Sequence, residues 1–236
     1  MTELIYQTDS YVKEFDAKIL KVDTEQHGVY LDRTAFYPGG GGQPHDTGQL
    51  IVDDKVYRVK RAARGNIHII EGDELPPIGA DVHGVLDWER RYRLMRTHTA
   101  MHILCGVVWR DYGASVTGGN MDLDRSRMDF EFERMQKELV QEIEAACNAE
   151  VEAARDVRVA ILPREEAFQI PELIRTKINL LPEGITEVRT VEIVGLDLQA
   201  DGGTHVANTR EVGRIRIPDY KSKGGINKRI YIELED

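Results

Sequence analysis

The chain has few cysteines and no long apolar run. Its two cysteines, Cys105 and Cys147, both fall in segments with helical periodicity, so we expect reduced thiols rather than a disulfide framework. No segment approaches the roughly 18 apolar residues of a membrane span. The first residues also lack the basic and apolar regions of a signal peptide. We therefore expect a cytoplasmic protein without a membrane segment.

An excess of positive charge is also absent. The formal net charge is -10 over 236 residues, which argues against a protein that coats nucleic acid through its overall field. Two local basic clusters remain, RRYRLMR (90–96) and YKSKGGINKR (220–229). They are candidate contacts for nucleic acid, and the alternative for any single residue in them is an ordinary solvated charge.

The first part of the chain is typical of β structure. An apolar share of 41% and a charged share of 31% are those of an ordinary globular protein. Short segments with β-branched or alternating residues, separated by turn signals, lie at 14–22, 27–37, 47–54, 55–63, 66–70 and 82–88. Strands this short and close together predict a small barrel or a strongly curved sheet. We place a domain boundary near residue 88, which gives domains 1–88 and 89–236.

After residue 88 the apolar spacing becomes helical. Residues 89–113 are apolar on more than one side, which predicts a buried helix. Residues 132–156 carry one apolar stripe, Leu139, Ile143 and Ala146, which predicts a helix with a solvated outer face. A short helix at 163–169 and strands at 157–162, 187–199, 211–217 and 228–235 complete an α+β fold, with antiparallel strands around the buried helix.

Three histidines could converge on a metal ion. His98 and His102 are one turn apart on the buried helix, so their imidazoles share a face. His205 follows two glycines in DGGTHVANT (201–209) and supplies a third imidazole from another element. Three protein ligands and an open position are typical of catalytic zinc, and Asp201 is either a fourth ligand or a carboxylate that orients one.

Other interpretations of these residues stay open. His98 and His102 could be buried, hydrogen-bonded core histidines, and Cys105, three residues after His102, competes as a ligand but is more typical of a helix core. The glycine-rich loop 36–48, which holds Gln43, and the segment 115–132 are either ligand-binding or only solvated loops. His45 and Asp46 are candidates for a general base, without support from the spacing.

Three motifs in this order resemble those of one family. LDRTAFYPGGGGQPHDTG (31–48) resembles the glycine-rich segment of alanyl-tRNA synthetases, RTHTAMHIL (96–104) their HxxxH helix and DGGTHVANTREVG (201–213) their CGGTH turn. SRMDFEF (126–132) resembles the segment between the last two. An adenylation domain and a long C-terminal extension are missing, so the chain resembles the stand-alone alanyl-tRNA editing proteins, the AlaX family, in the form with an N-terminal β domain.

The resemblance implies a zinc-dependent hydrolase that deacylates tRNA(Ala) mischarged with serine, and to some degree with glycine. It implies that His98, His102 and His205 bind Zn²⁺, while Asp201 replaces the cysteine of CGGTH. Gln43 and the preceding Gly41 and Gly42 become candidates for positioning the aminoacyl adenosine. Thr97 or Thr117 becomes a candidate for contacting the seryl hydroxyl, and Gly119 and Asn120 are candidates for lining a pocket for a short polar side chain.

The acceptor stem of the tRNA is expected to meet the basic clusters, at Arg90, Arg91, Arg93, Lys221, Lys223, Lys228 and Arg229. Either a monomer or a homodimer is compatible with the sequence. Two other functions also remain compatible with it. One is a zinc-dependent hydrolase of small amino-acid esters, and the other is a non-catalytic tRNA-binding module with a structural zinc, which a closed four-ligand site would favour.

Overall fold

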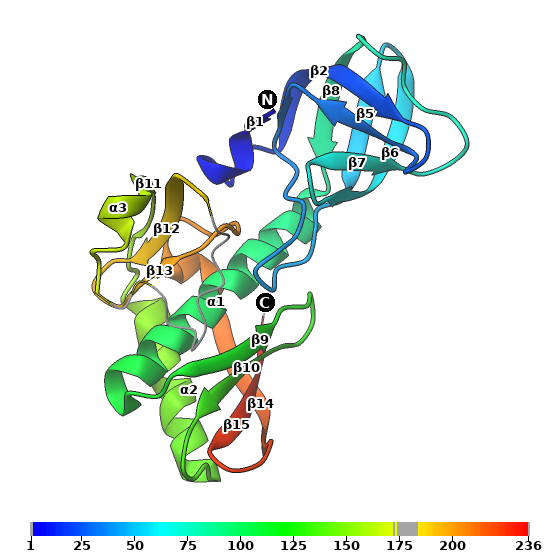
Figure 1. The fold of residues 1–236 in the computed structure, drawn as a ribbon. Coiled ribbons are helices and arrows are strands. Elements are labelled where there is room, and N and C mark those ends of the chain that lie inside the picture. The colour runs from blue at the N-terminus through cyan, green and yellow to red at the C-terminus, as the bar shows by residue number, and fades with distance from the viewer. Residues whose placement is uncertain (1, 172, 174–183, 236) are drawn as a thin grey trace. The chain divides into compact units, whose positions relative to one another are not determined.

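The computed structural model describes residues 2–171, 173 and 184–235 (Figure 1). The chain divides into two compact units, and the division falls inside helix α1 (Trp88–Tyr112), between Leu94 and Met95. The α+β fold class predicted from the sequence is confirmed. Among the described residues, no helix combines the length and apolarity that a bilayer crossing requires.

The first unit is built on a closed six-stranded barrel (Figure 1), as the spacing of short strands predicts. Its strands follow the order β2 (Glu14–Asp23), β3 (Gly28–Leu31), β7 (Ile67–Ile70), β6 (Lys55–Ala63), β5 (Gly48–Val52) and β8 (Asp81–Leu86). Alternate residues point inward, and Phe15, Ile19, Leu31 and Leu50 fill the core. A Cβ at Gly84 would lie 2.6 Å from the Phe15 ring, so this strand position requires glycine.

A short parallel pair and a 3₁₀ turn accompany the barrel strands. The pair consists of β1 (Glu3–Leu4) and β4 (Arg33–Thr34). The 3₁₀ turn, η1, covers Ile5–Gln7. One predicted strand, 27–37, is therefore interrupted after Leu31, because the chain leaves β3 to pair with the N-terminal residues.

The glycine-rich loop follows β4 and folds back on itself. Gly40 and Gln43 exchange two backbone hydrogen bonds, Gly40 N to Gln43 O at 3.1 Å and Gln43 N to Gly40 O at 2.9 Å. The φ angles of residues 39, 40, 41 and 42 are 82°, 142°, 56° and 95°, all in the region that favours glycine. The run of glycines therefore forms a defined turn.

The second unit has a four-stranded and a three-stranded antiparallel sheet. The order in the first is β14 (Arg214–Ser222), β15 (Asn227–Glu235), β10 (Ser126–Glu131) and β9 (Val116–Asn120). The order in the second is β11 (Val157–Pro163), β12 (Glu187–Ile193) and β13 (Asp197–Ala200). Short helices α3 (Arg164–Ala167) and η2 (Thr209–Val212) connect these strands.

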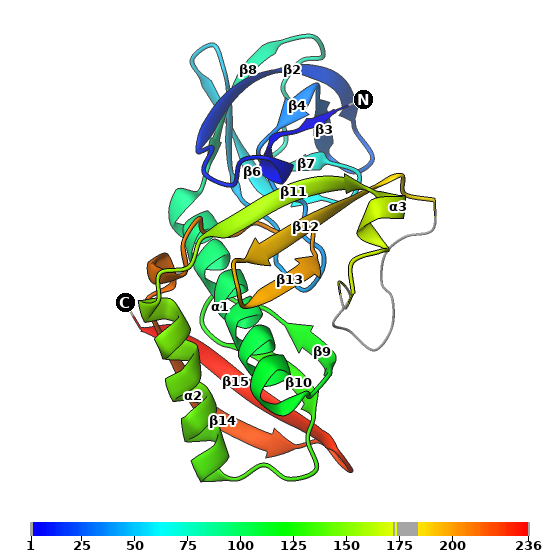
Figure 2. The ribbon, with the colours of Figure 1, turned by 90° about the vertical axis from the view of Figure 1, so that its left-hand side faces the viewer.

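Helix α2 (Lys137–Glu152) runs along β14 (Figure 2). Its buried apolar stripe is Val140, Ile143, Cys147 and Val151, one position away from the predicted stripe except at Ile143. The helix begins five residues later than predicted, because Phe132 donates a backbone hydrogen bond to Ile226 and continues the strand pairing. The Asn148 side chain also bonds both backbone groups of Ile215, which fixes α2 on the sheet.

The strands of the second unit differ in places from those expected from the sequence. The segment 115–132, for which a solvated loop was one interpretation, forms the hairpin β9–β10, and the run 187–199 breaks into β12 and β13 at Gly195, which has a φ of 76°. Glycine-rich β9 has low strand propensity. It is a strand because β10 pairs with both β9 and β15.

Candidate metal centre

Three imidazoles and one carboxylate converge in the second unit. His98 and His102 come from consecutive turns of α1, and His205 and Asp201 come from the segment after β13. Their candidate ligand atoms all lie within 4.8 Å of one another. The rings of His98 and His205 are stacked, with centroids 4.2 Å apart, and the His102 ring stands edge-on to both. All four residues that the sequence assigned to a metal site are thus together.

The Asp201 side chain shapes the turn that carries His205. Its Oδ2 accepts a hydrogen bond from the backbone N–H of Gly203 at 2.8 Å. The adjacent backbone is fixed by Arg189, whose Nη1 donates to the Asp201 carbonyl at 2.9 Å. Neither Gly202 nor Gly203 has a positive φ. His205 is therefore presented by an aspartate turn rather than by glycine-specific backbone angles.

Hydrogen bonds outside the cluster hold two of the rings. Nδ1 of His102 lies 3.1 Å from Oδ2 of Asp197, and Nδ1 of His205 lies 3.1 Å from the Thr99 hydroxyl. Asp197 and Thr99 are both buried and were not predicted as site residues. With Nδ1 engaged, Nε2 is the nitrogen that each of these two rings can offer to a metal.

The donor atoms lie close enough together to hold one metal ion. Neighbouring ligand atoms around zinc, with bonds of about 2.0–2.1 Å, lie roughly 3.3 Å apart. Asp201 Oδ2 is 3.0 Å from His205 Nε2, and Asp201 Oδ1 is 3.6 Å from His98 Nε2. Three imidazole nitrogens and one carboxylate oxygen suit zinc among other transition metals. Cys105, the competing candidate, is buried in α1 outside this group of donor atoms.

Burial and neighbouring charges set the protonation of the cluster. Burial lowers the pKa of His98 well below its ordinary value and that of His205 to about 4. Burial also acts to lower the pKa of His102, but the hydrogen bond and charge of Asp197 outweigh it and leave that pKa raised. Burial acts to raise the pKa of Asp201, yet the histidines hold it well below the usual range. Neutral imidazoles and an ionised carboxylate are the forms that bind metals. The pKa shifts of His98, His205 and Asp201 favour these forms, and that of His102 favours the protonated ring.

The other predicted pocket residues occupy several elements. Gln43 is buried in the glycine turn of the first unit, where Gly41 and Gly42 are exposed. Thr97 is buried on α1 beside His98. The remaining three lie on β9: the Thr117 hydroxyl donates to Asn227 at 3.0 Å, a Cβ at Gly119 would lie 3.5 Å from Met101, and Asn120 is exposed.

Two of the predicted tRNA contacts are wrong. Arg91 is 0% exposed, and its guanidinium bonds Asp46 and the carbonyls of Ser10 and Ala35. The same pair buries Asp46, one of the candidates for a general base. Lys228 is 6% exposed, because it lies on the inward-facing side of β15, and its ammonium bonds the Gly225 carbonyl.

The remaining basic residues are more accessible. Lys221 and Lys223 are exposed, and Arg90 and Arg93 are half-buried. Arg229 is paired with Asp129, and three cations lie against the Tyr231 ring: Arg125 at 4.4 Å, Lys221 at 5.0 Å and Arg229 at 6.0 Å from its centroid. Arg125, just before β10, and Tyr231 of β15 were not singled out in the sequence, because their contact depends on strands that are far apart along the chain.

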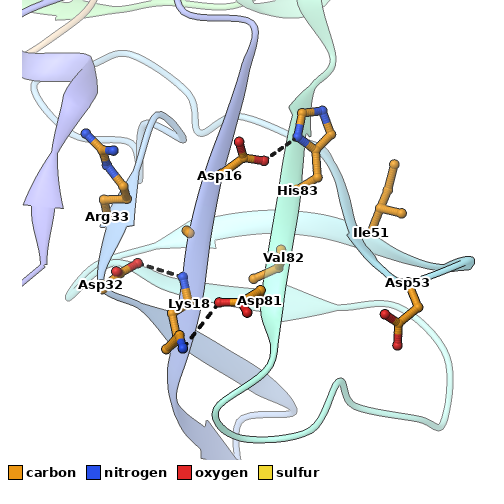
Figure 3. Close-up of a pocket in the computed structure, with 10 residues that line it drawn as sticks. Asp16, Lys18, Asp32, Arg33, Ile51, Asp53, Asp81, Val82 and His83 are labelled. Carbon is orange, nitrogen blue, oxygen red and sulfur yellow. Dashed lines mark hydrogen bonds and ion pairs between the residues drawn. The ribbon is translucent and has the colours of Figure 1, made fainter.

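A hollow on the barrel surface, drawn in Figure 3, has a different character. It is lined by four aspartates, of which Asp81 is paired with Lys18 and Asp16 with His83. Asp32 accepts a hydrogen bond from the backbone N–H of Lys18. The hollow contains none of the predicted site residues, and its carboxylates disfavour a phosphate backbone.

Comparison with known proteins connects both units to tRNA synthetases. Residues 188–231 match the threonyl and alanyl tRNA synthetase second additional domain, and residues 5–90 match the class II (A) tRNA synthetases. The chain is 40% identical over its full length to the alanyl-tRNA editing protein AlaX-M of Saccharolobus solfataricus, all of which is covered. It is also 40% identical to AlaX-M of Methanosarcina mazei, with 98% of that protein covered. A stretch covering 92% of the chain is 40% identical to 24% of the alanine–tRNA ligase of Pyrococcus furiosus.

Proposed function

The chain belongs to the alanyl-tRNA editing proteins of the AlaX-M type, and we propose that it hydrolyses the ester that joins tRNA(Ala) to a wrongly attached amino acid. The observation that carries this proposal is the buried cluster of three histidines and Asp201, in a chain that aligns with such proteins from end to end. The substrates are tRNA(Ala) charged with serine and, to a lesser degree, with glycine. The reaction takes place in the cytoplasm.

We assign editing to residues 89–236 and a Zn²⁺ site to His98, His102 and His205. Asp201 supplies the fourth donor in the arrangement described above. Bound zinc polarises a carbonyl and lowers the pKa of its water to about 7, which is the chemistry that ester hydrolysis needs. For this role a bound zinc would need a position open to water or substrate beside these donors.

Correctly charged Ala-tRNA(Ala) is spared from hydrolysis because alanine leaves polar groups of the pocket without hydrogen bonds. A pocket that hydrogen-bonds the serine hydroxyl leaves its own donors and acceptors unsatisfied when alanine enters. Thr97, Thr117, Gly119 and Asn120 are the proposed pocket residues, and Gln43 with Gly41 and Gly42 is proposed to contact the aminoacyl adenosine. Equal hydrolysis rates for Ser-tRNA(Ala) and Ala-tRNA(Ala) would remove this account of specificity.

The decisive experiment compares wild type with His205→Ala, measuring both Ser-tRNA(Ala) deacylation and metal content after zinc loading. His83→Ala is the matched control, because His83 is a partly exposed barrel histidine outside the cluster. We expect His205→Ala to lose metal and activity together and the control to keep both. Loss of metal with retention of activity would overturn the metal mechanism.

The four-donor cluster also supports a second candidate, a structural zinc in a tRNA-binding module. This candidate predicts tRNA binding by a metal-loaded wild type that deacylates nothing. A third candidate, a hydrolase of small amino-acid esters, predicts comparable turnover of a minimal seryl ester and of Ser-tRNA(Ala). Assays of binding, minimal ester and charged tRNA on the same preparation separate the three functions.

A further inference from the structure

Gly106 interrupts the buried part of α1 with a residue that weakens helices. Glycine in a helix interior costs about 1 kcal/mol relative to alanine, so a glycine here calls for a packing reason. A Cβ at Gly106 would lie 2.8 Å from Cγ of Leu196 and 3.1 Å from Cβ of Asp197. The turn between β12 and β13 therefore lies directly on the helix backbone, and β13 is beside α1 in both ribbon views (Figures 1 and 2).

The close approach places the carboxylate of Asp197 beside the cluster of three histidines and Asp201. Asp197 is the first residue of β13 and is 4% exposed. Its Oδ2 lies 3.1 Å from Nδ1 of His102, one helical turn before Gly106, and accepts a second hydrogen bond from Gln199 Nε2 at 2.7 Å. Gln199 thus holds the carboxylate in place, while Gly106 leaves it room.

The hydrogen bond to Asp197 dictates which nitrogen of His102 carries a proton. An ionised carboxylate can only accept, so Nδ1 must donate and Nε2 keeps its lone pair for a metal. The partner of His205 Nδ1 is the hydroxyl of Thr99, which can either donate or accept a hydrogen bond. This hydroxyl already accepts a hydrogen bond from the backbone N–H of Val206. Thr99 therefore does not dictate a tautomer, whereas Asp197 does.

We propose that Asp197 is a positioning residue that fixes the tautomer and orientation of His102 for metal binding, and that Gly106 is present in α1 to admit it. The proposal rests on the metal site proposed above. It assigns a function to a helix glycine that otherwise only weakens α1. It also makes the β12–β13 turn part of the site, although no residue of this turn is a metal ligand.

The first test measures zinc affinity by competition with a chelator. We expect Asp197→Ala to raise the dissociation constant about 10- to 100-fold, as losses of such outer partners do. Asp197→Asn keeps an acceptor but no charge, so it should fall between Asp197→Ala and wild type. Melting curves on each variant confirm that it is folded. Wild-type affinity in a folded Asp197→Ala would overturn the proposal.

A second test adds a methyl group at position 106 and then removes the side chain that it would contact. Gly106→Ala should weaken zinc binding even though alanine favours the helix, because the new methyl group pushes Leu196 and Asp197 away. Adding Leu196→Ala removes the nearest contact and should restore part of the affinity, while Leu196→Ala alone serves as the control. Undiminished zinc binding by Gly106→Ala would refute the role assigned to this glycine.

A third readout does not depend on metal. Imidazole ¹⁵N shifts of His102, assigned with a His102→Gln variant, report its tautomer in the metal-free protein at a pH where the ring is neutral. We expect the Nδ1–H form in wild type and a mixture in Asp197→Ala. If wild type binds no zinc, the proposed function fails, and this spectrum still decides the role of Asp197. An unchanged tautomer in Asp197→Ala would overturn it.

Discussion

Arg91 and Asp46 form a fully buried ion pair, with 0% and 1% of their side chains exposed. The Arg91 Nε lies 2.9 Å from Asp46 Oδ2, and that same oxygen accepts the backbone N–H of Tyr37 at 2.6 Å. The pair fixes both ends of the glycine-rich loop to the first turn of α1. Its residues were predicted to contact tRNA or to act as a base, and they are instead part of the loop's support.

Removing the arginine should destabilise the first unit strongly. Arg91→Met leaves the Asp46 carboxylate buried without its partner, which costs about 3–5 kcal/mol. The control is Arg33→Met, because Arg33 forms an exposed pair with Glu3 and such pairs contribute about 1 kcal/mol at most. Urea denaturation measures both variants. Equal stability losses would show that burial of the Asp46 pair does not matter.

The stability of the barrel should depend on pH through His68. Burial lowers the pKa of His68 to about 4 from 6.5. Below pH 6.5 the His68 imidazole is protonated in the unfolded chain but stays neutral in the folded chain. The contribution of His68 to the free energy of unfolding is therefore fully present above pH 6.5 and falls as the pH drops from 6.5 to about 4. The difference between the two pKa values of His68 corresponds to a loss of roughly 3 kcal/mol in the free energy of unfolding.

The measurement compares urea denaturation of wild type and His68→Gln between pH 4 and 8. The variant removes the titrating ring, so its stability should fall less steeply over this range. The other histidines are present in both proteins, so their contributions to the pH dependence cancel in the comparison. Parallel pH profiles would contradict the shifted pKa of His68.

Asp201 offers a test of the donor set. Asp201→Asn can still accept the Gly203 N–H and keep the turn, but it loses the charge that faces His98 and His205. We expect weaker zinc binding, measured with a chelator. Asp201→Cys introduces the cysteine of the CGGTH motif, and a thiolate should bind zinc at least as tightly as the carboxylate. Tighter zinc binding by Asp201→Asn than by wild type would exclude Asp201 as a donor.

The exposed lysines of β14 and the turn after it should contribute to tRNA binding. Lys221→Glu combined with Lys223→Glu should weaken binding of deacylated tRNA(Ala) and reduce its salt dependence by about one unit of slope for each lost phosphate contact. Lys137→Glu, on the exposed start of α2, is the control. An unchanged salt slope in the double variant would place the tRNA elsewhere.

The four residues of the cluster could be found from the sequence because each left a local signal. His98 and His102 are spaced by one helical turn, and Asp201 lies four residues before His205 in a polar turn. Asp197 left no such signal, since its contact with His102 depends on the close approach of two elements at Gly106. A mid-helix glycine was the one available hint.

Basic residues were harder to predict, for a geometric reason. Arg90, Arg91 and Arg93 are close in sequence but point in different directions, because each step along a helix turns the side chain by about 100°. Only Arg91 is buried. Lys228 and Arg229 are neighbours in β15, and because successive side chains of a strand point to opposite faces, only Lys228 is buried. Charge clusters in a sequence therefore do not show which members face solvent.

The backbone of the four consecutive glycines adopts angles that amino acids of the D configuration prefer. Their φ angles, from 56° to 142°, lie on the side of the Ramachandran plot that mirror-image amino acids prefer. A semisynthetic protein with D-alanine at position 42 should keep the turn, whereas L-alanine there should strain it. The loop thus uses the only genetically encoded residue without handedness to trace a path that a D-peptide would follow naturally.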